Sequence, residues 1–81
     1  GGDVRAVVGD RDPLFPDAGR AVIEANMGSA SLLQRKFNIG YPRAGKIIDQ
    51  LVNAGVLGAS TGAGKPRPVL MDSYSFERML E

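Results

Sequence analysis

Three side chains between residues 41 and 53 have types and spacing suited to reading double-stranded DNA. Arg43, Lys46 and Gln50 are three and four residues apart, so they lie along one side of a predicted helix. Arginine can donate two hydrogen bonds to O6 and N7 of guanine, lysine can bind guanine or phosphate, and glutamine can pair with adenine. A helix with this stripe suits the major groove. The polar face of an ordinary solvated helix would look similar, so the stripe alone does not decide between the two interpretations.

Basic residues are concentrated in one third of the chain. The 81 residues have a formal net charge of only +1. Residues 35–67 nevertheless contain six basic residues and a single acidic one. Such an asymmetry is typical of a surface that faces an anion, although scattered basic residues on a solvated face would also produce it. Beyond the stripe, four of these side chains are candidates for phosphate contacts: Arg35, Lys36, Lys65 and Arg67.

The composition argues against catalysis and metal binding. The chain has no histidine and no cysteine, which removes the commonest general base and the commonest zinc ligands. The stretch ASTGAGKP resembles a phosphate-binding P-loop. However, Ala59 stands where that motif requires its first glycine, and Pro66 stands where it requires serine or threonine. We therefore predict a domain that is not an enzyme and that needs no cofactor or metal.

Two predicted helices precede the helix that carries the stripe. The first begins at Asp12, which we expect to be its N-cap, with Pro13 in the first helical position. It ends at residues 26–28. The second covers residues 31–37 and begins at Ser31, whose hydroxyl is expected to cap it together with a glutamine three residues later. Both helices have an apolar side, so they can pack against the third.

The third predicted helix follows a three-residue turn at 38–40. Pro42 stands at its start, where a missing N–H has no cost, and Gly55 is expected to end it in a left-handed conformation. Its apolar residues recur at helical spacing: Ala44, Ile47, Ile48 and Leu51. A short turn between two helices is typical of the helix-turn-helix motif.

A β-hairpin is predicted after the third helix. Residues 56–57 and 69–71 are short apolar strands, and residues 58–66 form a glycine-rich loop with a basic tip. Three helices followed by a hairpin predict an α+β fold that is mainly α: a winged helix-turn-helix, which is a three-helix bundle plus a β-hairpin wing. A three-helix bundle with an unrelated hairpin is the structural alternative.

The chain is short enough to be a single domain. We expect residues 1–11 to be a flexible linker, residues 12–72 to be the winged-helix DNA-binding domain, and residues 73–81 to be a C-terminal tail that can form a short helix. No apolar run approaches the roughly 20 residues that span a bilayer, and no signal-peptide pattern occurs. The sequence therefore predicts a cytoplasmic domain without direct membrane contact.

Residues 12–71 resemble the C-terminal γ domain of the FtsK/SpoIIIE family of bacterial DNA translocases. The resemblance rests on DPLF, QRKFNIGY, RAGKIIDQL and GVLG, which occur in the family's order without gaps. It implies a winged helix that recognises short, skewed, G-rich octamers and orients a hexameric ATP-driven motor in chromosome segregation and cell division. It also implies that the motor domain and a membrane anchor lie elsewhere in the parent chain.

The resemblance assigns several positions and shows two departures. Arg43 matches the arginine of the family's GYxRA motif, and Arg35, Lys36 and Lys65 match basic positions. Many relatives have asparagine where this chain has Pro42, whose side chain cannot donate to a base edge. Lysine stands at a position that is usually arginine, and it cannot reproduce a bidentate contact. The octamer read by this chain is therefore not fixed by the resemblance.

A protein-interaction module is the alternative function. In some members the γ domain contacts the XerD recombinase, and the near-zero net charge, the acidic first helix and the acidic tail favour such a role. On this hypothesis the first helix and, if exposed, Phe76 and Met79 would contact the partner.

Overall fold

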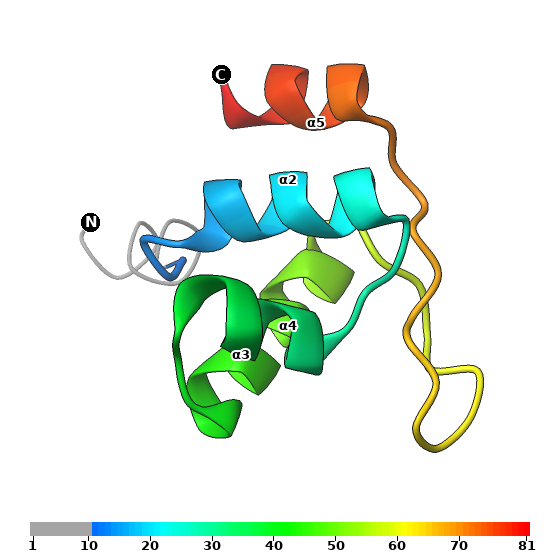
Figure 1. Ribbon diagram of the computed structural model, residues 1–81. Coiled ribbons are helices and arrows are strands. Elements are labelled where there is room, and N and C mark those ends of the chain that lie inside the picture. Colours follow the sequence, from blue (N-terminus) through cyan, green and yellow to red (C-terminus); the bar gives the residue numbers. More distant parts are fainter. Residues whose placement is uncertain (1–10) are drawn as a thin grey trace, which may run out of the picture.

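The computed structural model describes residues 11–81, which form a mainly helical unit (Figure 1). Residues 1–10, most of the predicted linker, lie outside this range. Figure 1 shows α2 in the middle, with α5 along one side of it and α3 and α4 on the other. No helix between residues 11 and 81 is long and apolar enough to cross a membrane. The helices are α2 (Phe15–Ala25), α3 (Ala30–Phe37), α4 (Tyr41–Asn53) and α5 (Ser73–Leu80).

α2 begins later than the sequence predicts, and Asp12 is not its N-cap. The carboxylate Oδ1 of Asp12 accepts a hydrogen bond from the Leu14 N–H (2.9 Å), and its backbone carbonyl accepts one from the Phe15 N–H (2.8 Å). These bonds form a separate turn before the helix, and Leu14 occupies the cap position without a side-chain bond. The prediction was wrong because Asp12 lies two residues before the cap position, in this separate turn. At the other end, Asn26 closes α2 in a left-handed conformation (φ 56°).

α3 is capped by a different serine from the one predicted. The hydroxyl of Ser29 accepts a hydrogen bond from the Leu32 N–H (3.2 Å), and the helix begins at Ala30. Ser31 therefore lies inside the first turn rather than at the cap. Both serines are chemically suitable, but only Ser29 has the extended backbone that a cap requires (φ −117°, ψ 126°).

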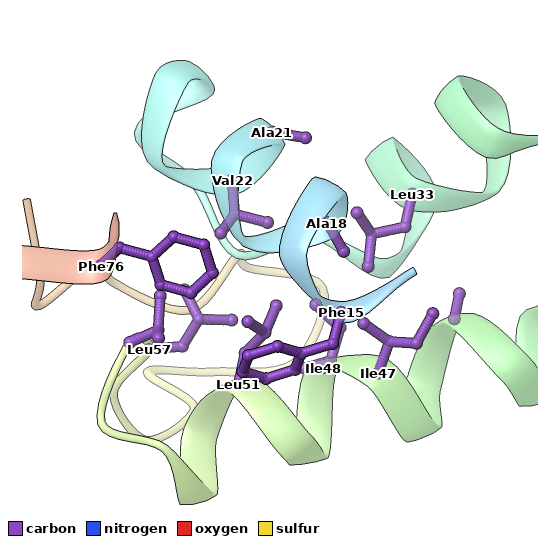
Figure 2. Close-up of a cluster of buried hydrophobic side chains, with 12 residues drawn as sticks. Phe15, Ala18, Ala21, Val22, Leu33, Ile47, Ile48, Leu51, Leu57 and Phe76 are labelled. Carbon is purple, nitrogen blue, oxygen red and sulfur yellow. The ribbon is translucent and has the colours of Figure 1, made fainter. Parts of the chain in front are cut away.

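α4 agrees closely with its prediction. Pro42 lies in the first turn, and Gly55 adopts the left-handed conformation beyond the last turn (φ 85°). All four predicted apolar positions are buried, and they join one cluster to which every helix contributes (Figure 2). Its members are Phe15, Ala18, Ala21, Val22, Leu33, Ala44, Ile47, Ile48, Leu51, Val56, Leu57 and Phe76.

α5 packs on the core mainly through one large side chain, with the half-buried Met79 and Leu80 beside it. Phe76 is fully buried, and its ring centroid lies 5.9 Å from that of Phe15. Gly19 makes room for this ring, since a Cβ atom at that position would lie 2.1 Å from Phe76 Cζ. The Asp72 carboxylate caps α5 by accepting from the Ser75 N–H (2.8 Å). Phe76 is therefore a core residue and not the exposed docking residue considered above.

The predicted hairpin is present only as one isolated antiparallel bridge, and a second bridge joins its base to the chain before α3. Leu57 pairs with Val69, Arg67 pairs with Gly28 ahead of α3, and no regular strand forms between residues 11 and 81. Pro68 explains part of this, because it has no N–H to donate to Gly58 on the neighbouring segment. The carbonyl of Gly58 instead accepts a bond from Nη1 of Arg67 (3.2 Å).

Candidate nucleic-acid interface

The outward side of α4 is the centre of the candidate site. A helix turns about 100° per residue, so the side opposite the buried residues carries positions 42, 46, 49 and 53. All four are exposed, and the charged ones are Lys46 and Asp49. Arg43 and Gln50 lie on one flank of this centre. The predicted stripe therefore runs along an edge of the exposed face, and only Lys46 reaches its middle.

Asp12 connects the chain before α2 to the flank of α4. Its carboxylate accepts two hydrogen bonds from Arg43, from Nε to Oδ2 and from Nη2 to Oδ1, both 2.8 Å. The Asp12 N–H donates to Oε1 of Gln50 (3.0 Å). A glutamine uses this oxygen together with its nitrogen to pair with adenine, so the Asp12 N–H competes with such a contact.

The Asp12–Arg43 pair is charged at neutral pH. The hydrogen bond from Arg43 holds the pKa of the Asp12 carboxyl below its usual range, and the Leu14 N–H and the charge of Lys46 lower it further against the effect of burial. The carboxylate in turn raises the pKa of Arg43. The Asp12 side chain is only 11% exposed, whereas that of Arg43 is 46% exposed, so the acid is enclosed and the guanidinium still reaches solvent.

A groove separates α4 from the loop that precedes Arg67. Its volume is about 480 Å³, and it is bordered by Tyr41, Gly45 and Asp49 on α4 and by Lys65 on the loop. Lys65 is exposed and faces the groove. Arg67 is half-buried, its backbone pairs with Gly28, and its side chain bonds to Gly58. Arg67 therefore holds the base of the loop rather than extending from it.

Arg35 and Lys36 are exposed in the last turn of α3, where basic side chains favour the negative end of the helix. Lys36 borders a different hollow of about 570 Å³ between α2, α3 and α5, together with Glu24 and Glu77. The structure thus brings Arg43, Lys46 and Gln50 together around Asp12 and places Lys65 across the groove. It does not bring Lys36 to the outward side of α4.

Sequence reasoning missed three residues at the site. Asp49 is exposed on the outward side of α4 and was recoverable from helical periodicity. Tyr41 was not, because its position in the helical repeat is nearer the buried residues than the outward side, although it is exposed and borders the groove. Asp12 had no such signal. Its partner Arg43 is 31 residues away, and a carboxylate before a proline is more typical of a helix cap.

Gly45 is open to substitution by alanine. A Cβ atom there would have no neighbour within 4 Å, and the residue is helical. Because glycine inside a helix is less favourable than alanine, Gly45→Ala is expected to raise the free energy of unfolding by about 0.5–1 kcal/mol, measured by urea denaturation. A decrease in stability would contradict the open space that the structure shows around a Cβ atom at Gly45.

Comparison with known proteins places these features in a family. A family model described as the Ftsk gamma domain matches residues 9–72. The chain is 42% identical to the DNA translocase FtsK of Caldanaerobacter subterraneus subsp. tengcongensis over 72 residues, which are 89% of this chain and 10% of that protein. It is 47% identical to the DNA translocase FtsK of Clostridium acetobutylicum over 64 residues, 79% of this chain and 8% of the relative. For the one from Chlamydia trachomatis, the identity is 50% over 62 residues, 76% of this chain and 8% of the relative. The chain therefore spans a tenth or less of these relatives.

Proposed function

The chain belongs to the FtsK gamma-domain family, and on this premise we propose that it is a winged helix-turn-helix domain that binds double-stranded DNA. It reads short, skewed, G-rich octamers and so orients the loading of a motor domain of the same parent chain in chromosome segregation and cell division. The domain itself is non-catalytic and works in the cytoplasm. The parent is an ATP-driven DNA translocase with a membrane anchor.

The observation that supports this proposal is the exposed outward side of α4. This helix follows α3 after the turn at 38–40, as the second helix of a helix-turn-helix does. The major groove is about 12 Å wide and admits one α-helix, whose N-terminal residues reach the base edges. The loop of residues 58–66 lies beside α4 across the groove, and Lys65 borders that groove. In the proposed complex this loop is the wing, and Lys65 contacts an adjacent phosphate.

The residues divide into two roles in this proposal. Lys46 and Asp49 read bases, because lysine binds guanine and a carboxylate accepts from N4 of cytosine on the complementary strand. Five basic side chains supply affinity, either by binding phosphates or by supporting the surface that binds them: Arg35, Lys36, Arg43, Lys65 and Arg67. Gln50 supports Asp12. Pro42 has no donor, which limits base contacts at the start of the helix.

A fluorescence-anisotropy titration tests this function. The 81-residue chain is titrated with a duplex that contains a skewed G-rich octamer and with a scrambled duplex of equal length, each at several salt concentrations. We expect tighter binding to the octamer, and binding to both that weakens as salt rises. Equal affinity for the two duplexes would refute sequence reading. Absence of binding to either would refute the DNA-binding function altogether.

A recombinase-docking role remains the second candidate, and the side of the molecule formed by α2 and α5 favours it. Asp17, Glu24 and Glu77 border the hollow between α2, α3 and α5, and this side lies across α2 from α4 (Figure 1). These three carboxylates outnumber the two basic residues of the same hollow, Arg20 and Lys36, and this small acidic excess suits a basic partner. Titration of the chain with a purified XerD-type recombinase, with DNA absent, distinguishes this role from DNA binding.

A further inference from the structure

Asp12 is held by contacts on both its backbone and its side chain. The carboxylate accepts from the Leu14 N–H and twice from Arg43, while its own N–H is bound to Gln50. Nothing in the general scheme of a helix-turn-helix requires a carboxylate from the preceding chain at this place. The network instead has a direct consequence for Arg43, the basic residue at the start of α4.

The network orders a side chain that is otherwise flexible. A free arginine loses rotamer entropy when it is immobilised, and a side chain that is already ordered does not have this cost on binding. Asp12 occupies the edge of the guanidinium formed by Nε and Nη2. Nη1 makes no hydrogen bond within residues 11–81, and the side chain remains 46% exposed. Arg43 is thus fixed in orientation and still has a donor for a ligand.

The position of Arg43 on α4 indicates which part of DNA it meets. It lies about 90° around the helix from the middle of the exposed side, at the flank of the surface that would enter the groove. Base edges lie beneath the middle of such a helix, whereas the sugar-phosphate backbone runs along its flanks.

We propose that Asp12 is a positioning residue that presents Arg43 to one phosphate of the DNA backbone. The inference rests on the DNA-binding function proposed above. Asp12 does not compete with DNA for Arg43, because its carboxylate is enclosed and accepts a further bond from the Leu14 N–H, while its backbone N–H is bound to Gln50. The phosphate therefore binds to Nη1 of Arg43, while the ion pair between Asp12 and Arg43 stays intact.

Asp12→Asn tests the proposal through the sign of its effect. The substitution removes a negative charge beside a DNA-binding surface, which by simple electrostatics strengthens binding. We expect the opposite: affinity falls about three- to tenfold, the scale of one hydrogen bond, for octamer and scrambled duplex alike. The dependence of log affinity on log salt becomes shallower by up to about one unit. Asparagine keeps an oxygen for the Leu14 N–H, and thermal unfolding verifies that the variant is folded.

Two further variants make the result specific. Asp17→Asn removes the same charge from an exposed carboxylate of α2 that pairs with Arg20, and it should bind DNA at least as tightly as the unsubstituted chain. In the background of Arg43→Ala, Asp12→Asn should have no further effect, because its action passes through that side chain. Unchanged or tighter binding by Asp12→Asn, or an equal loss in the Arg43→Ala background, would overturn the inference. If the unsubstituted chain binds neither duplex, it is the proposed function that fails.

Discussion

Replacing Phe76 with alanine is expected to lower the free energy of unfolding by about 3–5 kcal/mol, as measured by urea denaturation followed by circular dichroism. The ring is fully buried and packs against Phe15 and directly over Gly19. Its removal leaves a cavity lined by α2 and α5 that neither helix can fill, because Gly19 has no side chain. A domain of this size has a total stability on the order of 5–10 kcal/mol, so the loss is a large part of it.

Tyr74→Ala is the matched control for this result. Tyr74 is an aromatic residue of the same helix, but it is 70% exposed, and its hydroxyl accepts a hydrogen bond from the exposed Arg78. We expect it to change stability by no more than about 0.5 kcal/mol. A loss below about 1 kcal/mol for Phe76→Ala would mean that α5 is dispensable, as the predicted domain boundary at residue 72 implies. A large loss would extend the domain to the end of α5.

The elements that the sequence predicted well are those defined by local periodicity. The buried side of α4, its proline in the first turn and its terminal Gly55 all depend on residues within a few positions of one another. Burial confirms each of the four apolar positions because a helix repeats its faces regularly.

The predictions that failed depended on competition or on long-range partners. Ser29 and Ser31 were both suitable caps, and Ser29 has the extended backbone of a cap, next to Gly28, which pairs with the distant Arg67. The hairpin was expected from its apolar residues. Pro68, however, has no N–H to donate to the neighbouring segment, and a single bridge forms within the predicted hairpin.

The candidate site was predicted in composition but not in orientation. Counting residues placed Arg43, Lys46 and Gln50 on one stripe, which is correct, yet the stripe lies at the edge of the exposed side. Two of its members are bound by Asp12, which is remote in sequence from both. No pattern within α4 contains that information, because the partner lies before α2. The stripe is therefore best divided into a base-reading centre at Lys46 and a flank at Arg43.

Because Lys46 lies at the centre of the outward side of α4, its replacement is expected to have a large effect on DNA affinity. We expect Lys46→Glu to weaken binding of the octamer duplex by about 1–3 kcal/mol, or roughly five- to 150-fold, in the anisotropy titration. The substitution removes a donor to guanine or phosphate and places a negative charge at the centre of the surface that faces DNA. Because the side chain is exposed on the outward side of α4, the free energy of unfolding should change by no more than about 0.5 kcal/mol.

Arg78→Glu is the control that distinguishes the effect of where a charge is reversed from the effect of the change in net charge. It changes the net charge equally, but Arg78 is exposed on α5, across α2 from α4 (Figure 1). Charges farther from DNA than the Debye length of about 8 Å at physiological salt contribute little, so this variant should retain most of the affinity. If both reversals weakened binding equally, attraction would depend on net charge, and α4 would not be the reading helix. If only Lys46→Glu did so while folding stayed intact, DNA would have to meet the outward side of α4, where Lys46 alone of the predicted stripe reaches the centre.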